Sequence, residues 1–219
     1  MASNAEKGGR VAVIVAHPDD ETMWACGLLL KHAELDLTII ALNHRTDPDR
    51  APRFHRALAR YGARGDLGAL RDGGREDELP EGQVEETILH LLPRATFDLV
   101  LTHSPRGEYT EHKFHDEVSD AVRVLFEQGR LQANELWHFA YDDDGARSVP
   151  HPAQNASLVL PLTQAQFRDK LAIIQGIYGF GPDAWETVNA PRTEAFRRVR
   201  PDPAEPGLPS LLLDPGRVL

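Results

Sequence analysis

Apolar residues in this chain gather in short continuous runs rather than alternating with polar residues. Three such runs, rich in Val, Ile and Leu, occupy residues 11–16, 35–42 and 97–102. A run of this length without polar alternation is typical of a strand that is covered on both faces, as in a parallel sheet. Two further apolar segments, 135–141 and 157–162, are also predicted to be strands.

Segments with helical periodicity lie between and after these strands. The predicted helices span residues 19–32, 51–61, 84–92, 116–128 and 163–178. Acidic residues open the first, while glycine or proline follows several of the others, as expected at helix ends. Strands that alternate with helices predict a single α/β domain with a Rossmann-like, mostly parallel sheet and helices on both faces.

The two ends of the chain differ in composition from this central part. Residues 1–9 are small and polar, and we expect a disordered leader there, followed by one domain over 10–199. The segment 200–219 contains five prolines, which predicts an extended tail. No signal-peptide pattern and no apolar run long enough for a bilayer occurs, so the expected location is the cytoplasm.

Charge and cysteine content narrow the function classes. The sequence has 24 Lys and Arg against 34 Asp and Glu, a net charge of −10. Such a balance argues against broad nucleic-acid binding and against membrane insertion, although it allows a local basic pocket. The single cysteine, Cys26, excludes an intrachain disulfide and a Cys-rich zinc site. Any metal site must therefore use His, Asp or Glu.

A dense cluster of such side chains, His17-Pro18-Asp19-Asp20-Glu21, comes directly after the first predicted strand. Ligands of open α/β sheets collect beyond the carboxyl ends of the strands. His17 and Asp20 are three residues apart and suit Zn²⁺, while Asp19 would stay free to take a proton from an activated water. Helix capping is the simpler interpretation, but capping accounts for only one of these acidic residues.

A second cluster follows the third predicted strand, where His112 and His115 stand three residues apart at the entry to a helix. One of the two would complete a His-Asp-His set, and the other would lie beside the open position. A histidine pair alone is more often a surface pair or a hydrogen-bonded core pair. Two clusters after two separate strands together indicate one metal site.

At these residues the sequence resembles the LmbE-like family of zinc-dependent de-N-acetylases, also named after the N-acetylglucosaminyl-phosphatidylinositol deacetylase. AHPDDE at 16–21 and HKFH at 112–115 carry the resemblance, and weaker similarity covers 11–199. The resemblance implies one zinc ion and assigns a role to each residue of the two motifs. The implied roles are zinc ligands for His17, Asp20 and His115, general base for Asp19, and oxyanion stabiliser for His112.

The sequence also departs from the family pattern. Lys113-Phe114 stands where the family usually has Pro-Asp, so an orienting carboxylate is missing there, and Asp116 or Glu111 is a candidate to replace it. Arg53 stands where the family commonly has Glu. These changes affect the substrate assignment more than the metal site.

Candidate substrate-binding residues lie near both motifs. Residues 45–75 hold eight arginines against four aspartates, which favours either an anion site or, slightly more, a solvated helix face. Arg50 matches the family's substrate-side arginine, and Arg106 lies close to the second motif. Asp72 is placed to bond a sugar hydroxyl or to sit in a turn, and Tyr109 loosely matches a family active-site tyrosine.

The sequence therefore predicts hydrolysis of the N-acetyl group of an amino sugar or related small molecule. Two alternatives stay open, namely an amidase for a thiol-sugar conjugate or natural-product intermediate, and a metal- or sugar-binding module without turnover. The same donors also suit Fe²⁺ or another divalent ion. The sequence leaves homo-oligomer formation open. A dinucleotide-binding protein is disfavoured, because HPDDE replaces the Gly-rich phosphate loop.

Overall fold

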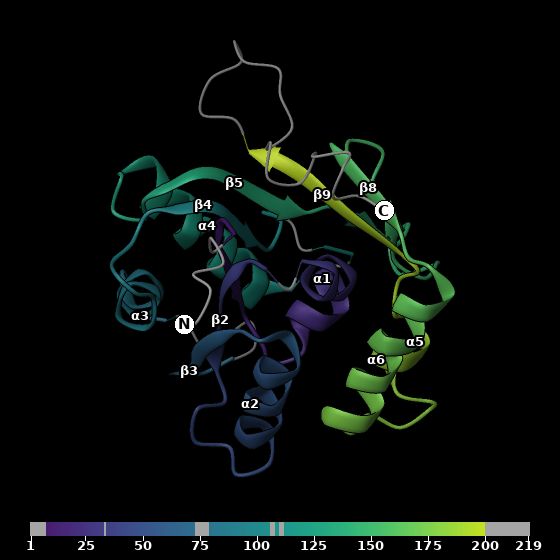
Figure 1. The fold of residues 1–219 in the computed structure, drawn as a ribbon. Helices are drawn as coiled ribbons and strands as arrows, with labels where there is room; N and C mark the ends of the chain where they lie inside the picture. Colours follow the sequence, from purple (N-terminus) through teal and green to yellow (C-terminus); the bar gives the residue numbers. More distant parts are fainter. Residues whose placement is uncertain (1–7, 33, 73–78, 106–107, 110–111, 200–219) are drawn as a thin grey trace, which may run out of the picture.

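One seven-stranded sheet organises the chain (Figure 1). The computed structural model describes residues 8–32, 34–72, 79–105, 108–109 and 112–199. The strand order is β3-β2-β1-β4-β5-β9-β8. The strands are β1 (Arg10–Val15), β2 (Asp36–Asn43), β3 (Arg64–Leu70), β4 (Phe97–Thr102), β5 (Ala133–Phe139), β8 (Leu158–Pro161) and β9 (Thr193–Val199). A separate two-stranded ribbon joins β6 (Tyr141–Asp142) to β7 (His151–Pro152).

The first five strands of the sheet are parallel, and β1 lies between β2 and β4. Val11 of β1 is opposite Leu37 on one side and Leu99 on the other. The chain winds outward from β1 in one direction through β2 and β3, and in the other through β4 and β5. The carboxyl ends of β1 and β4 therefore border the switch point, where ligands of such sheets bind.

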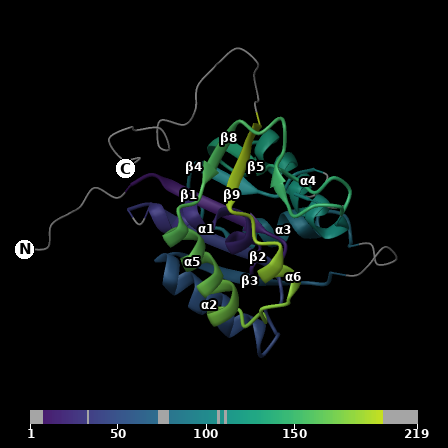
Figure 2. The ribbon, with the colours of Figure 1, turned by 90° about the vertical axis from the view of Figure 1, so that its right-hand side faces the viewer.

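Helices cover both faces of the sheet, as the sequence predicts. They are α1 (Asp20–Lys31), α2 (Arg50–Tyr61), α3 (Gln83–Leu91), α4 (Lys113–Glu127), α5 (Gln164–Ala172), the π-helix η1 (Ile173–Ile177) and α6 (Trp185–Val188). One apolar core joins the sheet to α1, α2, α5 and η1, and a second joins it to α3 and α4. Helices α5 and α6 lie toward the viewer in Figure 2. In the described part of the chain, no helix combines the length and the apolarity that a membrane crossing requires.

The sequence pattern misses two strands of the seven-stranded sheet and also the short strand β7 of the ribbon. Strand β3 (RGDLGAL) contains two glycines and an aspartate, which hide its apolar pattern. Gly65 and Gly68 are needed there because a Cβ at either position would meet the backbone of β2 at 1.6 or 2.3 Å. Strand β9 (TEAFRRV) pairs antiparallel with β5 and β8, so the sheet is mostly rather than wholly parallel.

Candidate functional site

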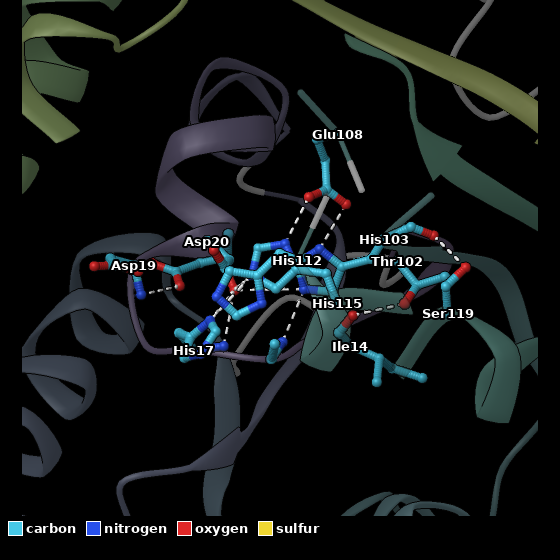
Figure 3. Close-up of polar contacts among 12 residues, drawn as sticks. Ile14, His17, Asp19, Asp20, Thr102, His103, Glu108, His112, His115 and Ser119 are labelled. Atoms are coloured by element: carbon cyan, nitrogen blue, oxygen red, sulfur yellow. Dashed lines mark hydrogen bonds and ion pairs between the residues drawn. The ribbon is translucent and has the colours of Figure 1, made fainter. Parts of the chain in front are cut away.

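The two histidine-bearing motifs meet at the switch point of the sheet (Figure 3). His17 lies two residues beyond the end of β1, and Asp20 begins α1. His115 lies in the first turn of α4, which begins at Lys113, three residues before the predicted helix start. Because β1 and β4 are neighbouring parallel strands, the segments that follow them leave the sheet at the same edge.

Three donor atoms form a compact triangle at this edge. His17 Nδ1 lies 3.1 Å from His115 Nε2 and 3.3 Å from Asp20 Oδ2, and the third side, from His115 Nε2 to Asp20 Oδ2, is 3.6 Å. Donors about 2.0–2.2 Å from a tetrahedral zinc ion stand about 3.3–3.6 Å apart. The donor set therefore fits a zinc ion in both chemistry and spacing.

The outer nitrogen of each imidazole bonds to a carboxylate. His17 Nε2 donates to Asp72 Oδ2 at 2.8 Å, and His115 Nδ1 donates to Glu108 Oε2 at 2.8 Å. In these tautomers the remaining lone pairs of both rings face each other and face Asp20. Burial opposes a charge on His17, but its hydrogen bonds to Asp20 and Asp72 prevail and raise its pKa to about 10. The cluster thus favours a positive charge at its centre, as carboxylate–histidine–metal arrangements do.

Glu108 and His103 form the floor of this site, and both are fully buried. Glu108 Oε1 accepts from His103 Nδ1 at 2.6 Å, while its other oxygen holds His115. His103 Nε2 accepts from the backbone N–H of Ala16 at 2.8 Å. Glu108 is not among the residues that the sequence predicts for the site. The available signal is its position, five residues after a histidine that directly follows a strand.

Asp19 lies next to the triangle and outside it. Its backbone has φ 121°, a conformation that is rare and strained for a residue other than glycine and that is concentrated at functional sites. The side chain is buried, and its Oδ2 lies 3.6 Å from Arg50 Nη1. Burial and the neighbouring Asp20 raise the pKa of Asp19 well above its usual range, although Arg50 opposes that shift.

His112 lies at the outer side of the donor triangle, and its ring stacks on that of His115 with centroids 4.3 Å apart. Its Nδ1 is buried without a hydrogen-bond partner among the described residues. Burial, with the charges of His115 and His17, lowers the pKa of His112, which favours the neutral ring. Its donor atom also lies within 4.8 Å of those of His17 and His115, so His112 is a fourth group within reach of the same ion.

The residues predicted to bind substrate differ from one another in what they contact. Arg50 faces Asp19 and lies 5.7 Å from the ring centroid of Phe180. Asp72 bonds to His17, a role that the sequence did not suggest. Tyr109 stacks on Trp24 and contacts Trp185 at a tilt, with ring centroids 5.2 and 4.8 Å apart. Arg106 and Glu111 lie outside the described residues.

The other arginines of the 45–75 segment are mostly in ion pairs at the surface. They include Arg45 with Asp66, Arg53 with Asp49, Arg60 with Asp169 and Arg64 with Asp36. Such exposed pairs contribute little stability. Their presence favours the solvated-face interpretation for most of the segment and leaves Arg50 as the arginine that reaches the site.

Comparisons with known proteins agree on the fold. No family model and no curated protein matches the sequence. Among solved structures, the N,N'-diacetylchitobiose deacetylase of Pyrococcus horikoshii aligns with 89% of this chain and 85% of its own, at TM-score 0.62 and 14% identity. The zinc-inhibited form of the teicoplanin deacetylase Orf2 aligns with 88% of this chain and 100% of its own, at TM-score 0.60 and 14% identity.

The same fold also carries another chemistry. GalB, the 4-carboxy-2-hydroxymuconate hydratase of Pseudomonas putida KT2440, aligns with 91% of this chain and 100% of its own, at TM-score 0.55 and 16% identity. At these identities the similarity establishes the fold alone, which this chain shares with the two deacetylases and with the hydratase. Function has to be argued from the site, because one fold hosts several reactions.

Proposed function

We propose that this chain, which has the fold of the LmbE-like deacetylases, belongs to that family and is a metal-dependent hydrolase of N-acetyl groups. The substrate would be an N-acylated small molecule, most simply an amino sugar. One observation carries the proposal, namely a tight triangle of His17, Asp20 and His115 donors with the buried carboxyl of Asp19 left outside it. A site that only bound a metal would need no such additional carboxyl.

His17, Asp20 and His115 would hold the ion, and zinc fits their donor set best among common ions. A zinc ion in such a site supplies Lewis-acid activation of water and of the amide carbonyl. The carboxylate–histidine bonds from Asp72 and Glu108 keep the two imidazoles oriented for this role.

Asp19 would act on protons in both halves of the reaction. It first takes a proton from the water that attacks the amide carbonyl carbon. It then gives this proton to the nitrogen of the leaving amine as the C–N bond breaks, because an amide anion is a very poor leaving group. A carboxyl with a raised pKa suits both steps, since it holds the proton long enough to return it.

His112 would stabilise the negative charge that develops on the carbonyl oxygen. A protonated ring would donate from both of its nitrogens. The lowered pKa of His112 favours a neutral ring that donates one N–H instead. Such a donor is typically worth about 3–4 kcal/mol of transition-state stabilisation. Arg50, which is partly exposed beside Asp19, would contact the substrate.

Release of free amine is the direct test. The protein, loaded with zinc, is assayed against N-acetylglucosamine, N,N'-diacetylchitobiose and an N-acetylated thiol-sugar conjugate. We expect turnover of at least one, and a fall in kcat of about 10²–10⁴-fold for Asp19→Asn with zinc still bound. Asp98 lies near the start of β4, at the other end of the strand from the site. Asp98→Asn is therefore the matched control and should keep wild-type activity.

Two results would contradict the proposal. Near wild-type activity of the Asp19→Asn variant with zinc bound would remove Asp19 as the base. Stoichiometric zinc without amine release from any substrate, extended to acylated natural-product intermediates, would favour a binding module.

A further inference from the structure

Glu108 is a buried carboxylate that two histidines share. Its Oε1 accepts from His103 Nδ1 at 2.6 Å and from the backbone N–H of Ser104 at 3.1 Å. Its Oε2 accepts from His115 Nδ1 at 2.8 Å. The Glu108 side chain has no exposed surface, and that of His115 is 3% exposed. Hydrogen bonds to a buried carboxylate are short and strong, and their geometry leaves little freedom to either ring.

His103 extends this contact to the other half of the site. Its Nε2 accepts from the backbone N–H of Ala16 at 2.8 Å, so the proton of this ring must sit on Nδ1, facing Glu108. Ala16 directly precedes His17. A continuous series of hydrogen bonds therefore connects the loop after β1 to the helix that carries His115 (Figure 3).

We propose that Glu108, acting with His103, is a positioning residue that fixes the proton of His115 on Nδ1 and joins the two halves of the metal site. The inference rests on the proposed function, in which His115 is a metal ligand. Glu108 would supply the orienting carboxylate that is missing between His112 and His115, where Lys113-Phe114 stands. That carboxylate comes from the loop after β4 rather than from within the motif.

To bind a metal ion, His115 needs a lone pair on the nitrogen that faces the other donors of the triangle. A neutral imidazole has one nitrogen with a proton and one with a lone pair, and the partner of the first nitrogen decides which is which. With Nδ1 bonded to Glu108, the Nε2 lone pair of His115 faces His17 Nδ1 and Asp20 Oδ2. The carboxylate also raises the basicity of the ring as a ligand.

Glu108→Gln should keep the hydrogen bond to His103 and remove the one to His115, without changing the size of the side chain. An amide has one accepting oxygen, whereas its nitrogen only donates. The tautomer of His103 is fixed by Ala16, so His103 takes the oxygen, and the amide nitrogen then faces the Nδ1–H of His115. Two donors cannot face each other, so His115 adopts the other tautomer or turns away. In either case no Nε2 lone pair points into the donor triangle.

Two measurements test this inference. Zinc is titrated against a chromophoric chelator into metal-free wild type, Glu108→Gln and Glu194→Gln. Glu194 is the control because it is also fully buried and also accepts backbone N–H bonds, from Gly27 and Leu28. We expect the zinc Kd to rise about 10–100-fold in Glu108→Gln and to stay within twofold of wild type in Glu194→Gln.

The second measurement uses ¹⁵N chemical shifts of the imidazoles in metal-free wild-type protein. We expect His115 and His103 both to carry the proton on Nδ1, and His115 to lose this tautomer in Glu108→Gln. A wild-type His115 with its proton on Nε2 would overturn the inference even if the variant failed to fold. So would an unchanged zinc Kd in a folded Glu108→Gln protein.

Failure of the inference and failure of the proposed function give different results. If wild type binds zinc and Glu108→Gln binds it weakly, the positioning role stands whether or not any amide is hydrolysed. If wild type hydrolyses an amide while Glu108→Gln keeps its zinc Kd, the function stands and the positioning role falls.

Discussion

His17 Nδ1 and His115 Nε2 lie 3.1 Å apart, although 98 residues separate them in the chain. Each ring directs its other nitrogen to a carboxylate, Asp72 for His17 and Glu108 for His115. Two imidazole nitrogens at this distance need a proton or a metal cation between them, because two bare lone pairs would repel. Occupation by zinc should therefore stabilise the fold by linkage, because the unfolded chain does not hold these donors together.

The first prediction concerns this stabilisation. At a zinc concentration 100 times the Kd, wild type should gain about 2.7 kcal/mol, or roughly 5–10 °C in Tm. His115→Ala should lose both stoichiometric zinc and the gain in Tm. His55→Ala, on the exposed face of α2, should keep both. Differential scanning calorimetry with and without zinc measures the effect, and an equal gain in His115→Ala would contradict the metal site.

The second prediction separates two roles for Asp72. If Asp72 holds His17 in position, Asp72→Ala should weaken zinc binding about 10–100-fold. If Asp72 only binds substrate, as the sequence suggests, KM should rise while the zinc Kd stays unchanged. We expect the first result. Asp66→Ala, on β3 in an exposed ion pair with Arg45, should alter neither quantity.

Much of the fold follows from local sequence pattern. The buried strands β1, β2 and β4 are continuous apolar runs, and their alternation with helices predicts a mostly parallel sheet, although not the strand order. Strand β3 could not be found in this way, since its glycines serve the close approach to β2 rather than an apolar pattern. The antiparallel placement of β9 depends on pairing with β5, which is a tertiary effect.

The candidate site is likewise only partly predictable from the sequence. The spacing of His17 and Asp20 after a strand marks a candidate metal site in the sequence itself. Glu108 carries no such mark, because its function depends on the positions of His103 and His115 in space. Asp72 likewise reads as a turn residue or a sugar contact until the structure places it on His17. Carboxylates that act through another side chain are recognised from contacts rather than from spacing.

The third prediction concerns the turn after η1, which Arg53 of α2 contacts. Arg53 Nη1 donates to the carbonyl oxygen of Tyr178, and Gly179 follows with φ +80°. A Cβ at Gly179 would lie 1.7 Å from Arg53 Nη1. Gly179→Ala should therefore displace Arg53 and strain the backbone, at a cost of about 1–3 kcal/mol in the free energy of unfolding.

Gly176 is the matched control for this substitution. It lies three residues earlier, in η1, and among the described residues no atom outside its own stretch of helix lies within 4 Å of an added Cβ. Gly176→Ala should be neutral or stabilise the protein by about 0.5–1 kcal/mol, because alanine loses less backbone entropy in a helix. Urea denaturation compares the two variants, and equal effects would show that neither Arg53 nor the backbone angle matters.

The last prediction is a pH dependence that arises from a buried histidine outside the donor triangle. His138 of β5 is 3% exposed, and its Nε2 has no hydrogen-bond partner among the described residues. Burial, with the nearby charge of Arg197, lowers the pKa of His138 from 6.5 to about 4. In the unfolded chain His138 binds a proton below about pH 6.5, whereas in the folded protein it binds one only near pH 4. The free energy of unfolding therefore falls as the pH drops through this interval.

Removing His138 should remove that part of the acid sensitivity. The shift corresponds to at most about 3 kcal/mol, complete near pH 4 and absent above pH 7. His138→Leu should lose less stability than wild type between pH 6.5 and 4, whereas His90→Gln, an exposed substitution on α3, should follow wild type. Urea midpoints at several pH values measure this difference. Parallel curves for wild type and His138→Leu would mean that His138 titrates normally in the folded protein, despite its burial beside Arg197.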